Sequence, residues 1–128
     1  MKKNLFLLLC ILSFGGCLER EVYTDISDPS YISHPPSALH IYDLSGMLKS
    51  DFKNDSNAPI RLEVYTHSAN CTNAQSRSLG TDFDGYIRIT IKEQNTTIAR
   101  AQMDYKSEPN AQKVQVVYDH LIKQLQWR

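Results

Sequence analysis

The sequence has no excess of charge of either sign. It contains 14 basic and 14 acidic residues, so its formal net charge is zero near neutral pH. Proteins that bind nucleic acid usually present a concentrated positive surface to the phosphate backbone. The balanced charge therefore argues against nucleic acid as a partner.

Cysteine is scarce, with three residues in the sequence. Cys10 and Cys17 both belong to the N-terminal segment, so Cys71 is the one cysteine left in the rest of the chain. A leftover cysteine in an oxidising compartment is either free or paired with another chain. We expect no disulfide within the chain.

The sequence also lacks the motifs of common catalytic sites, such as G-x-S-x-G, H-E-x-x-H, a glycine-rich phosphate loop or C-x-x-C. His67 and Cys71 have a spacing that could serve a metal ion or an activated thiol, but no third group lies nearby in the sequence. Asp82 and Asp84 flank a strand start, where carboxylates commonly cap turns. We therefore predict a protein that is not an enzyme and that has no metal or cofactor.

No apolar run is long enough to span a membrane. The longest, residues 5–14, has about half of the roughly 20 residues that a transmembrane helix needs. Lys2 and Lys3 precede it, and Gly15 and Gly16 follow it. A positive start, a short apolar region and a small-residue cleavage site predict a signal peptide over residues 1–16.

The segment Phe14-Gly15-Gly16-Cys17 resembles the lipobox of bacterial lipoproteins, which has an apolar residue, a small residue, Gly or Ala, and then the acceptor cysteine. The resemblance implies cleavage before Cys17 and lipidation of that residue, palmitate being a usual acyl chain. Each buried methylene adds about 0.8 kcal/mol of membrane affinity, so several chains anchor a protein permanently. Leu18, in place of Asp, favours the outer membrane. Ordinary secretion and an uncleaved anchor are the alternatives.

The mature chain divides into a tether and one domain. Residues 17–37 contain Asp, Ser and Pro without sustained periodicity, which is typical of a flexible tether between the lipid and the fold. Residues 38–128 have the length of a single domain. Ser37 as N-cap and a stripe of Ile41, Leu44, Leu48 and Phe52 predict a helix, although Leu39 with Ile41 would also suit a short strand before a shorter helix.

The remaining elements follow from alternation and helical spacing. Residues 60–66 alternate as a half-buried strand, and a polar loop spans residues 67–81. Residues 86–92 and 97–105 predict a hairpin, and residues 112–125 an amphipathic helix. We therefore expect an α+β fold, with a small antiparallel sheet of three to four strands packed against two helices, preceded by the signal peptide and the flexible tether.

Two sets of exposed residues are candidate sites. Glu93, Asn95 and Thr97 fit the bacterial N-glycosylation acceptor pattern at a turn, although Asn95 could serve turn geometry alone. The strand face opposite the apolar one mixes tyrosine with charged residues, as contact surfaces do, although such residues are also ordinary on a solvated face. The residues of this predicted partner-binding face are Arg61, Glu63, Tyr65, Tyr86 and Arg88.

The order of elements resembles the lipopolysaccharide-assembly lipoprotein (LptE) family, and residues 84–125, about a third of the chain, carry the likeness. Secretion-system pilotin lipoproteins are a second family of similar size and anchoring. The resemblance implies a membrane-anchored, non-enzymatic accessory or assembly factor on the outer membrane, facing the periplasm or the cell exterior, with an envelope protein as partner. The alternative is an inhibitor or immunity lipoprotein that blocks a toxin or a lysozyme with the loop 67–81.

Overall fold

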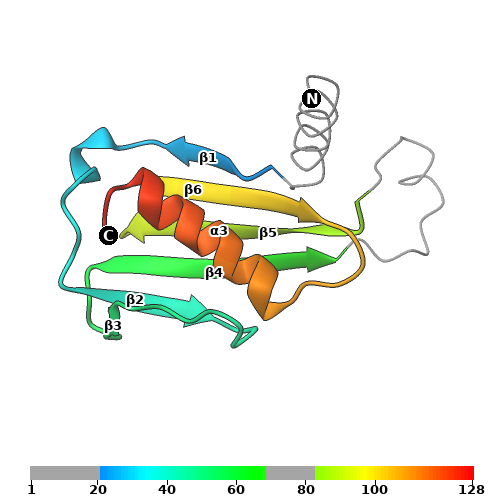
Figure 1. Ribbon diagram of the computed structural model, residues 1–128. Coiled ribbons are helices and arrows are strands. Elements are labelled where there is room, and N and C mark those ends of the chain that lie inside the picture. Colours follow the sequence, from blue (N-terminus) through cyan, green and yellow to red (C-terminus); the bar gives the residue numbers. More distant parts are fainter. Residues whose placement is uncertain (1–20, 69–82) are drawn as a thin grey trace, which may run out of the picture.

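A six-stranded sheet with the order β1-β6-β5-β4-β2-β3 forms the centre of the molecule (Figure 1). The computed structural model describes residues 21–68 and 83–128. One α-helix, α3 (Ala111–Gln124), and a 3-10 turn, η2 (Pro29–Tyr31), accompany the sheet. The strands are β1 (Tyr23–Ile26), β2 (Ala38–Asp43), β3 (Lys53–Asn54), β4 (Ile60–Ser68), β5 (Gly85–Glu93) and β6 (Thr96–Tyr105).

The sheet is mixed. The pairs β1–β6, β6–β5 and β5–β4 are antiparallel, whereas β2 runs parallel to both β4 and β3. Parallel neighbours need a connection that crosses from one end of the sheet to the other. Residues 44–59 supply this connection between β2 and β4, with β3 in its course.

The predicted strand and hairpin are confirmed. Residues 60–66 lie in β4, and residues 86–92 and 97–105 lie in β5 and β6. Alternate positions of these strands point to one face, as their alternating sequence requires. The buried residues of that face are Ile60, Leu62, Val64, Ile87, Ile89, Ile91, Ala99, Ala101, Met103 and Tyr105.

Strand β6 contains a β-bulge near its start. Ile91 pairs with Ala99 and Lys92 with Thr97, so Ile98 has no partner on β5. The bulge buries Ile98 beside Ala99 and turns Thr97 toward the opposite face. The carbonyl oxygen of Ile98 accepts backbone hydrogen bonds from Ser27 (2.8 Å) and Asp28 (3.1 Å), which join the end of β1 to the bulge.

Helix α3 confirms the helix predicted over residues 112–125. The side chain of Asn110 caps its N-terminus by accepting a hydrogen bond from the backbone N–H of Lys113 (2.8 Å), an ordinary N-cap arrangement. One face of the helix packs on β5 and β6. Its buried residues are Val114, Val117, Tyr118, Leu121 and Ile122, followed by the buried Leu125 just past its end.

The helix predicted from Ile41 to Phe52 is wrong. Residues 38–43 form β2, as in the short-strand alternative, but no helix follows it. The carboxylate of Asp43 accepts hydrogen bonds from the backbone N–H groups of Ser45 (3.0 Å) and Leu48 (2.9 Å). These bonds form a local turn instead of a helix. Gly46 within it has a positive φ of 67°.

The flexible tether predicted over residues 17–37 is wrong for residues 21–37, which the structure describes. Strand β1 lies within them and pairs with β6 at the edge of the sheet. The expected α+β fold, with three to four strands against two helices, is also wrong. The described chain has a six-stranded mixed sheet and one α-helix, so it is mostly β. In β1 and β2, pairing with strands distant in the sequence, rather than local periodicity, determines the secondary structure.

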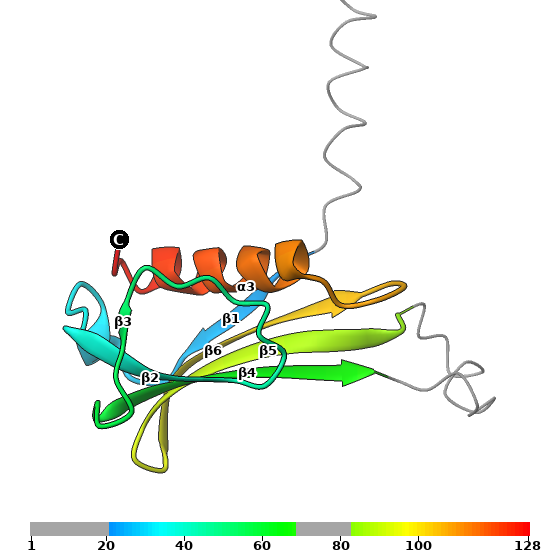
Figure 2. The same cartoon turned by 90° about the horizontal axis from the view of Figure 1, so that it is seen from below.

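Helix α3 covers a single face of the sheet (Figure 2). Met47, Leu48 and Phe52 from the connection after β2 are partly buried against the core on the same side, in place of the second helix. Trp127 packs against Phe52, with ring centroids 5.8 Å apart, and donates a hydrogen bond to the carbonyl oxygen of Tyr31 (2.8 Å). No helix within residues 21–68 and 83–128 is long and apolar enough to cross a membrane.

Candidate functional site

The face of the sheet opposite α3 carries no helix in the described ranges, and we call it the helix-free face (Figure 2). The pleat and the register place alternate residues of the three longest strands on it. They are Arg61, Glu63, Tyr65 and His67 of β4, Tyr86, Arg88, Thr90 and Lys92 of β5, and Thr97, Arg100, Gln102 and Asp104 of β6. All five residues of the predicted partner-binding face, Arg61, Glu63, Tyr65, Tyr86 and Arg88, lie here.

Three charged side chains on the β4 side of this face pair with one another. Glu63 Oε2 lies 3.1 Å from Lys92 Nζ, and Glu63 Oε1 lies 3.2 Å from Arg61 Nε, although that second pair lacks hydrogen-bond alignment. The guanidinium of Arg61 also lies over the ring of Tyr42, 4.5 Å from its centroid. Arg61 and Lys92 therefore share one carboxylate, and Arg61 is also covered by a ring.

Aromatic side chains form a row toward the other end of β4 and β5. The ring of His67 stacks on that of Tyr86 at 5.0 Å, and the ring of Tyr65 lies 5.9 Å from Tyr86. The guanidinium of Arg88 also lies over the ring of Tyr86, 5.0 Å from its centroid. Mutual packing holds these side chains in place, so the surface is ordered in advance of any contact.

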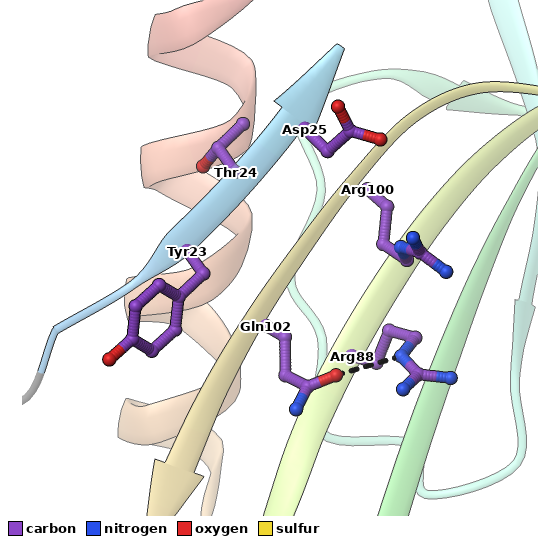
Figure 3. A pocket seen from close by; sticks show the side chains of 6 residues that line it. All are labelled: Tyr23, Thr24, Asp25, Arg88, Arg100 and Gln102. Carbon is purple, nitrogen blue, oxygen red and sulfur yellow. Dashed lines mark hydrogen bonds between the residues drawn. The ribbon is translucent and has the colours of Figure 1, made fainter. Parts of the chain in front are cut away.

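Two surface hollows lie next to each other on the helix-free face, and both are lined by Arg88 and Arg100. The first, of about 320 Å³, lies between β1, β6 and β5 (Figure 3). The second, of about 390 Å³, lies over β4, β5 and β6. The other residues of the first are Tyr23, Thr24, Asp25 and Gln102, and those of the second are Glu63, Tyr65, Tyr86, Thr90, Lys92 and Thr97.

Arg88 and Arg100 keep their charge free. Within the described parts of the chain neither forms an ion pair, although Asp25 lines the same hollow. Arg88 Nε donates a hydrogen bond to Gln102 Oε1 (2.9 Å), which fixes the plane of its guanidinium (Figure 3). Two unpaired guanidinium groups beside tyrosine rings can bind an anionic or planar polar group.

Sequence reasoning missed part of this site. Arg100 and Gln102 stand at alternate positions of β6, so the alternation that identified β5 could also have identified them. Tyr23 and Asp25 lie in β1, within the segment expected to be a tether, and four residues carry too little periodic signal to reveal a strand.

The other predicted residues that the structure describes do not line the two hollows. Cys17, Cys71 and Asp82 lie outside the described residues, and His67 is stacked on Tyr86. Asp84 Oδ2 accepts a hydrogen bond from the backbone N–H of Ser107 (2.7 Å), which is the turn role expected of it. Among residues 21–68 and 83–128, no three His, Cys, Asp or Glu side chains are grouped as a metal site would need.

Asn95 lies in the exposed two-residue turn between β5 and β6. Its glycosylation stays a prediction. The acidic residue of the acceptor pattern, Glu93, accepts a hydrogen bond from the Tyr31 hydroxyl. This bond, with the negative charge of Glu93, raises the pKa of Tyr31.

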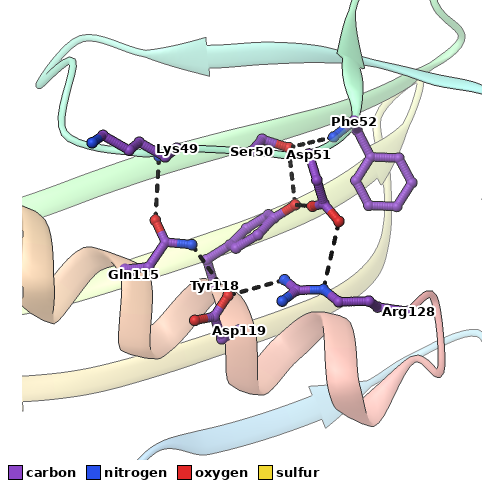
Figure 4. A network of polar contacts seen from close by, with 8 residues as sticks. All are labelled: Lys49, Ser50, Asp51, Phe52, Gln115, Tyr118, Asp119 and Arg128. Carbon is purple, nitrogen blue, oxygen red and sulfur yellow. Dashed lines mark hydrogen bonds and ion pairs between the residues drawn. The ribbon is translucent and has the colours of Figure 1, made fainter.

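A second polar cluster joins residues 49–52 to helix α3 (Figure 4). The Tyr118 hydroxyl donates a hydrogen bond to Asp51 Oδ1 (2.8 Å), and the Ser50 hydroxyl lies 2.9 Å from it. Arg128 pairs with Asp51 (3.5 Å) and with Asp119 (3.0 Å). Burial of the Tyr118 side chain raises its pKa to about 12, and the Tyr118 hydrogen bond lowers the pKa of Asp51. The groups of this cluster hydrogen-bond and ion-pair with one another, as in a structural clamp.

No protein-family model matches this chain, and neither a curated protein nor a solved structure shows significant similarity to it. Its function must therefore be inferred from its own residues.

Proposed function

We propose that this chain is a lipid-anchored, non-enzymatic accessory protein of a bacterial envelope complex, which binds an envelope protein through the helix-free face. The lipobox-like segment ending at Cys17 supports the anchor. Leu18 after it supports the outer membrane as the location. The observation that carries the binding role is the pair of unpaired guanidinium groups, Arg88 and Arg100, beside exposed tyrosines.

The tyrosines of this face are unusually exposed for such large side chains. Tyr23, Tyr42 and Tyr65 are 59%, 42% and 52% exposed. Tyr42 stands opposite Glu63 and Tyr23 opposite Gln102, so all three share the helix-free face. Tyrosine and arginine are the residue types that contribute most to protein interfaces, because they combine large contact area with directional hydrogen bonds.

Permanent anchoring fits a binding role on this face. A lipid on Cys17 would confine the domain to one membrane surface, which raises its effective concentration toward partners in that surface. A domain that works by binding needs a contact surface and no catalytic group, and the helix-free face offers such a contact surface. The proposal therefore accounts for the anchor and the face together.

Co-purification from detergent-solubilised membranes tests the proposal. We expect the chain to recover a specific envelope protein, and expect Tyr65→Ala to reduce that recovery at least about tenfold, as for an interface hot spot. Val116→Ala is the matched control, since Val116 is 45% exposed but lies on helix α3. The Val116→Ala variant should recover as much of the envelope protein as the native chain does.

Labelling with palmitate tests the anchor separately. The native chain should incorporate the label, and Cys17→Ser should not. An unlabelled native chain, or one that repeatedly purifies without any partner, would contradict the proposed function.

A further inference from the structure

Arg88 and Arg100 lie diagonally across neighbouring strands on the helix-free face. Arg88 pairs with Gln102 on β6, and Arg100 stands two positions before Gln102 on that strand. Diagonal neighbours in an antiparallel pair are about 7–8 Å apart, within the reach of two long side chains that converge on one ligand. Figure 3 shows the two guanidinium groups on the same side of the sheet.

The other arginines of the helix-free face and of the C-terminus have carboxylate partners. Arg61 pairs with Glu63, and Arg128 pairs with Asp51 and Asp119. In the described chain Arg88 and Arg100 have none, although the protein as a whole has equal numbers of acids and bases. The second hollow has three cations around it, and its one acid, Glu63, is already in ion pairs with Lys92 and Arg61. An excess of positive charge is therefore left in the hollow.

The groups around this charge suit a tetrahedral anion. The bond from Arg88 Nε to Gln102 orients the guanidinium and leaves its two terminal amino groups for a ligand. Thr90 and Thr97 add hydroxyl groups to the lining of the same hollow. A phosphate monoester has three acceptor oxygens and nearly two negative charges at neutral pH, which matches two guanidinium groups with nearby hydroxyls.

We propose that the hollow between β4, β5 and β6 is a binding site for a phosphate monoester, held by Arg88 and Arg100. The ligand is either a free phosphorylated molecule or the phosphate of a lipid headgroup. This site goes beyond the proposed function, because it needs neither the lipid anchor nor a protein partner in order to bind.

Isothermal titration of the purified full chain in a nonionic detergent tests the site. The probes are inorganic phosphate, dioctanoyl phosphatidic acid, and dioctanoyl phosphatidylcholine as the phosphodiester control. We expect saturable binding of inorganic phosphate at low ionic strength. Phosphatidic acid should bind at least tenfold more tightly if the ligand is a lipid, and about equally if it is a free molecule.

The variants Arg88→Gln and Arg100→Gln should each weaken phosphate binding at least about tenfold, as expected for loss of a charge-assisted bidentate contact. Lys123→Gln removes the same charge from the exposed end of α3 and should change the affinity less than twofold. Arg88→Lys keeps the charge without the planar fork, and should bind several-fold more weakly than the native chain while keeping its unfolding midpoint.

Absence of saturable phosphate binding in the native chain would overturn this site. Native affinity in both glutamine variants would overturn it too, and so would an equal loss in Lys123→Gln, which would indicate a diffuse charge effect. Phosphate binding without partner recovery would contradict the proposed function alone, and partner recovery without phosphate binding would contradict this site alone.

Discussion

Gly85 begins β5 at a place where two strands approach it closely. It pairs with Ser68 on one side and Tyr105 on the other. A Cβ at this position would overlap the carbonyl oxygen of His67 and lie 2.5 Å from the Tyr105 hydroxyl. That hydroxyl donates a hydrogen bond to the same carbonyl oxygen (2.9 Å), so neither atom can move without breaking the bond.

We expect Gly85→Ala to lower the free energy of unfolding by about 3 kcal/mol, because the backbone must shift to admit the methyl group. Urea unfolding followed by circular dichroism measures the change. Gly46→Ala is the control: a Cβ there meets nothing within 4 Å, so only its positive φ should matter, with a loss of about 1 kcal/mol. Equal losses in the two variants would contradict the steric explanation.

At the scale of the elements, the bulge in β6 decides which residues face the core. Regular alternation from Tyr105 backward would point Thr97 inward and Ile98 outward. The extra residue reverses this order, so that Ile98 is buried and Thr97 lines the second hollow. The bulge thereby joins the core to the candidate site.

We expect Ile98→Ala to lower the free energy of unfolding by about 3 kcal/mol, since it leaves a cavity in the core. Thr97→Ala, one residue away on the other face, should change it by less than about 0.5 kcal/mol. Chemical denaturation of both variants measures the difference. A larger loss for Thr97→Ala would mean that β6 continues without a bulge.

Elements with strong local signals could be predicted from the sequence. Ile87, Ile89 and Ile91 alternate with polar residues, and Val114 and Leu121 stand at helical spacing, so local pattern and tertiary burial agree. The hairpin, β4 and α3 follow from such signals. The same alternation identified five residues of the helix-free face.

The segment after Ser37 could not be predicted in the same way, because its apolar spacing fits a helix as well as a strand. Leu39 is fully buried, but Leu44, a member of the predicted helical stripe, is 83% exposed. Pairing of β2 with β4 and the Asp43 turn override the helical period. Strand β1 depends wholly on β6 for its form, and no pattern within four residues shows this.

On the scale of the whole molecule, the cluster around Tyr118 links the connection after β2 to α3 and the C-terminus (Figure 4). The pKa of the Tyr118 hydroxyl is about 12, above the ordinary 10.0 of tyrosine, so the folded protein holds this proton more tightly than the unfolded chain does. This contribution to stability is complete below pH 10 and is lost as the pH rises from 10 to about 12.

We therefore expect Tyr118→Phe to be less stable than the native protein at pH 9, and expect the difference to shrink as the pH rises through 10 toward 12. Urea unfolding at a series of pH values measures it. Tyr23→Phe, which changes an exposed tyrosine, should keep the native pH dependence. A difference that grows with pH would contradict the assigned role of the Tyr118 hydroxyl.

The pairing of β1 with β6 and of β2 with β4 has a consequence for the order of folding. Synthesis proceeds from the amino end, yet β1, the strand made first, finds its partner only when β6 exists, whereas β2 can pair once β3 and β4 have followed it. A nascent chain therefore carries β1 unpaired until β6 is complete, and β2 lacks its β4 neighbour until β4 is complete. Both strands are short, and in β1, which has four residues, every second side chain is exposed. Each strand therefore offers few backbone groups with which a strand of another nascent chain could pair.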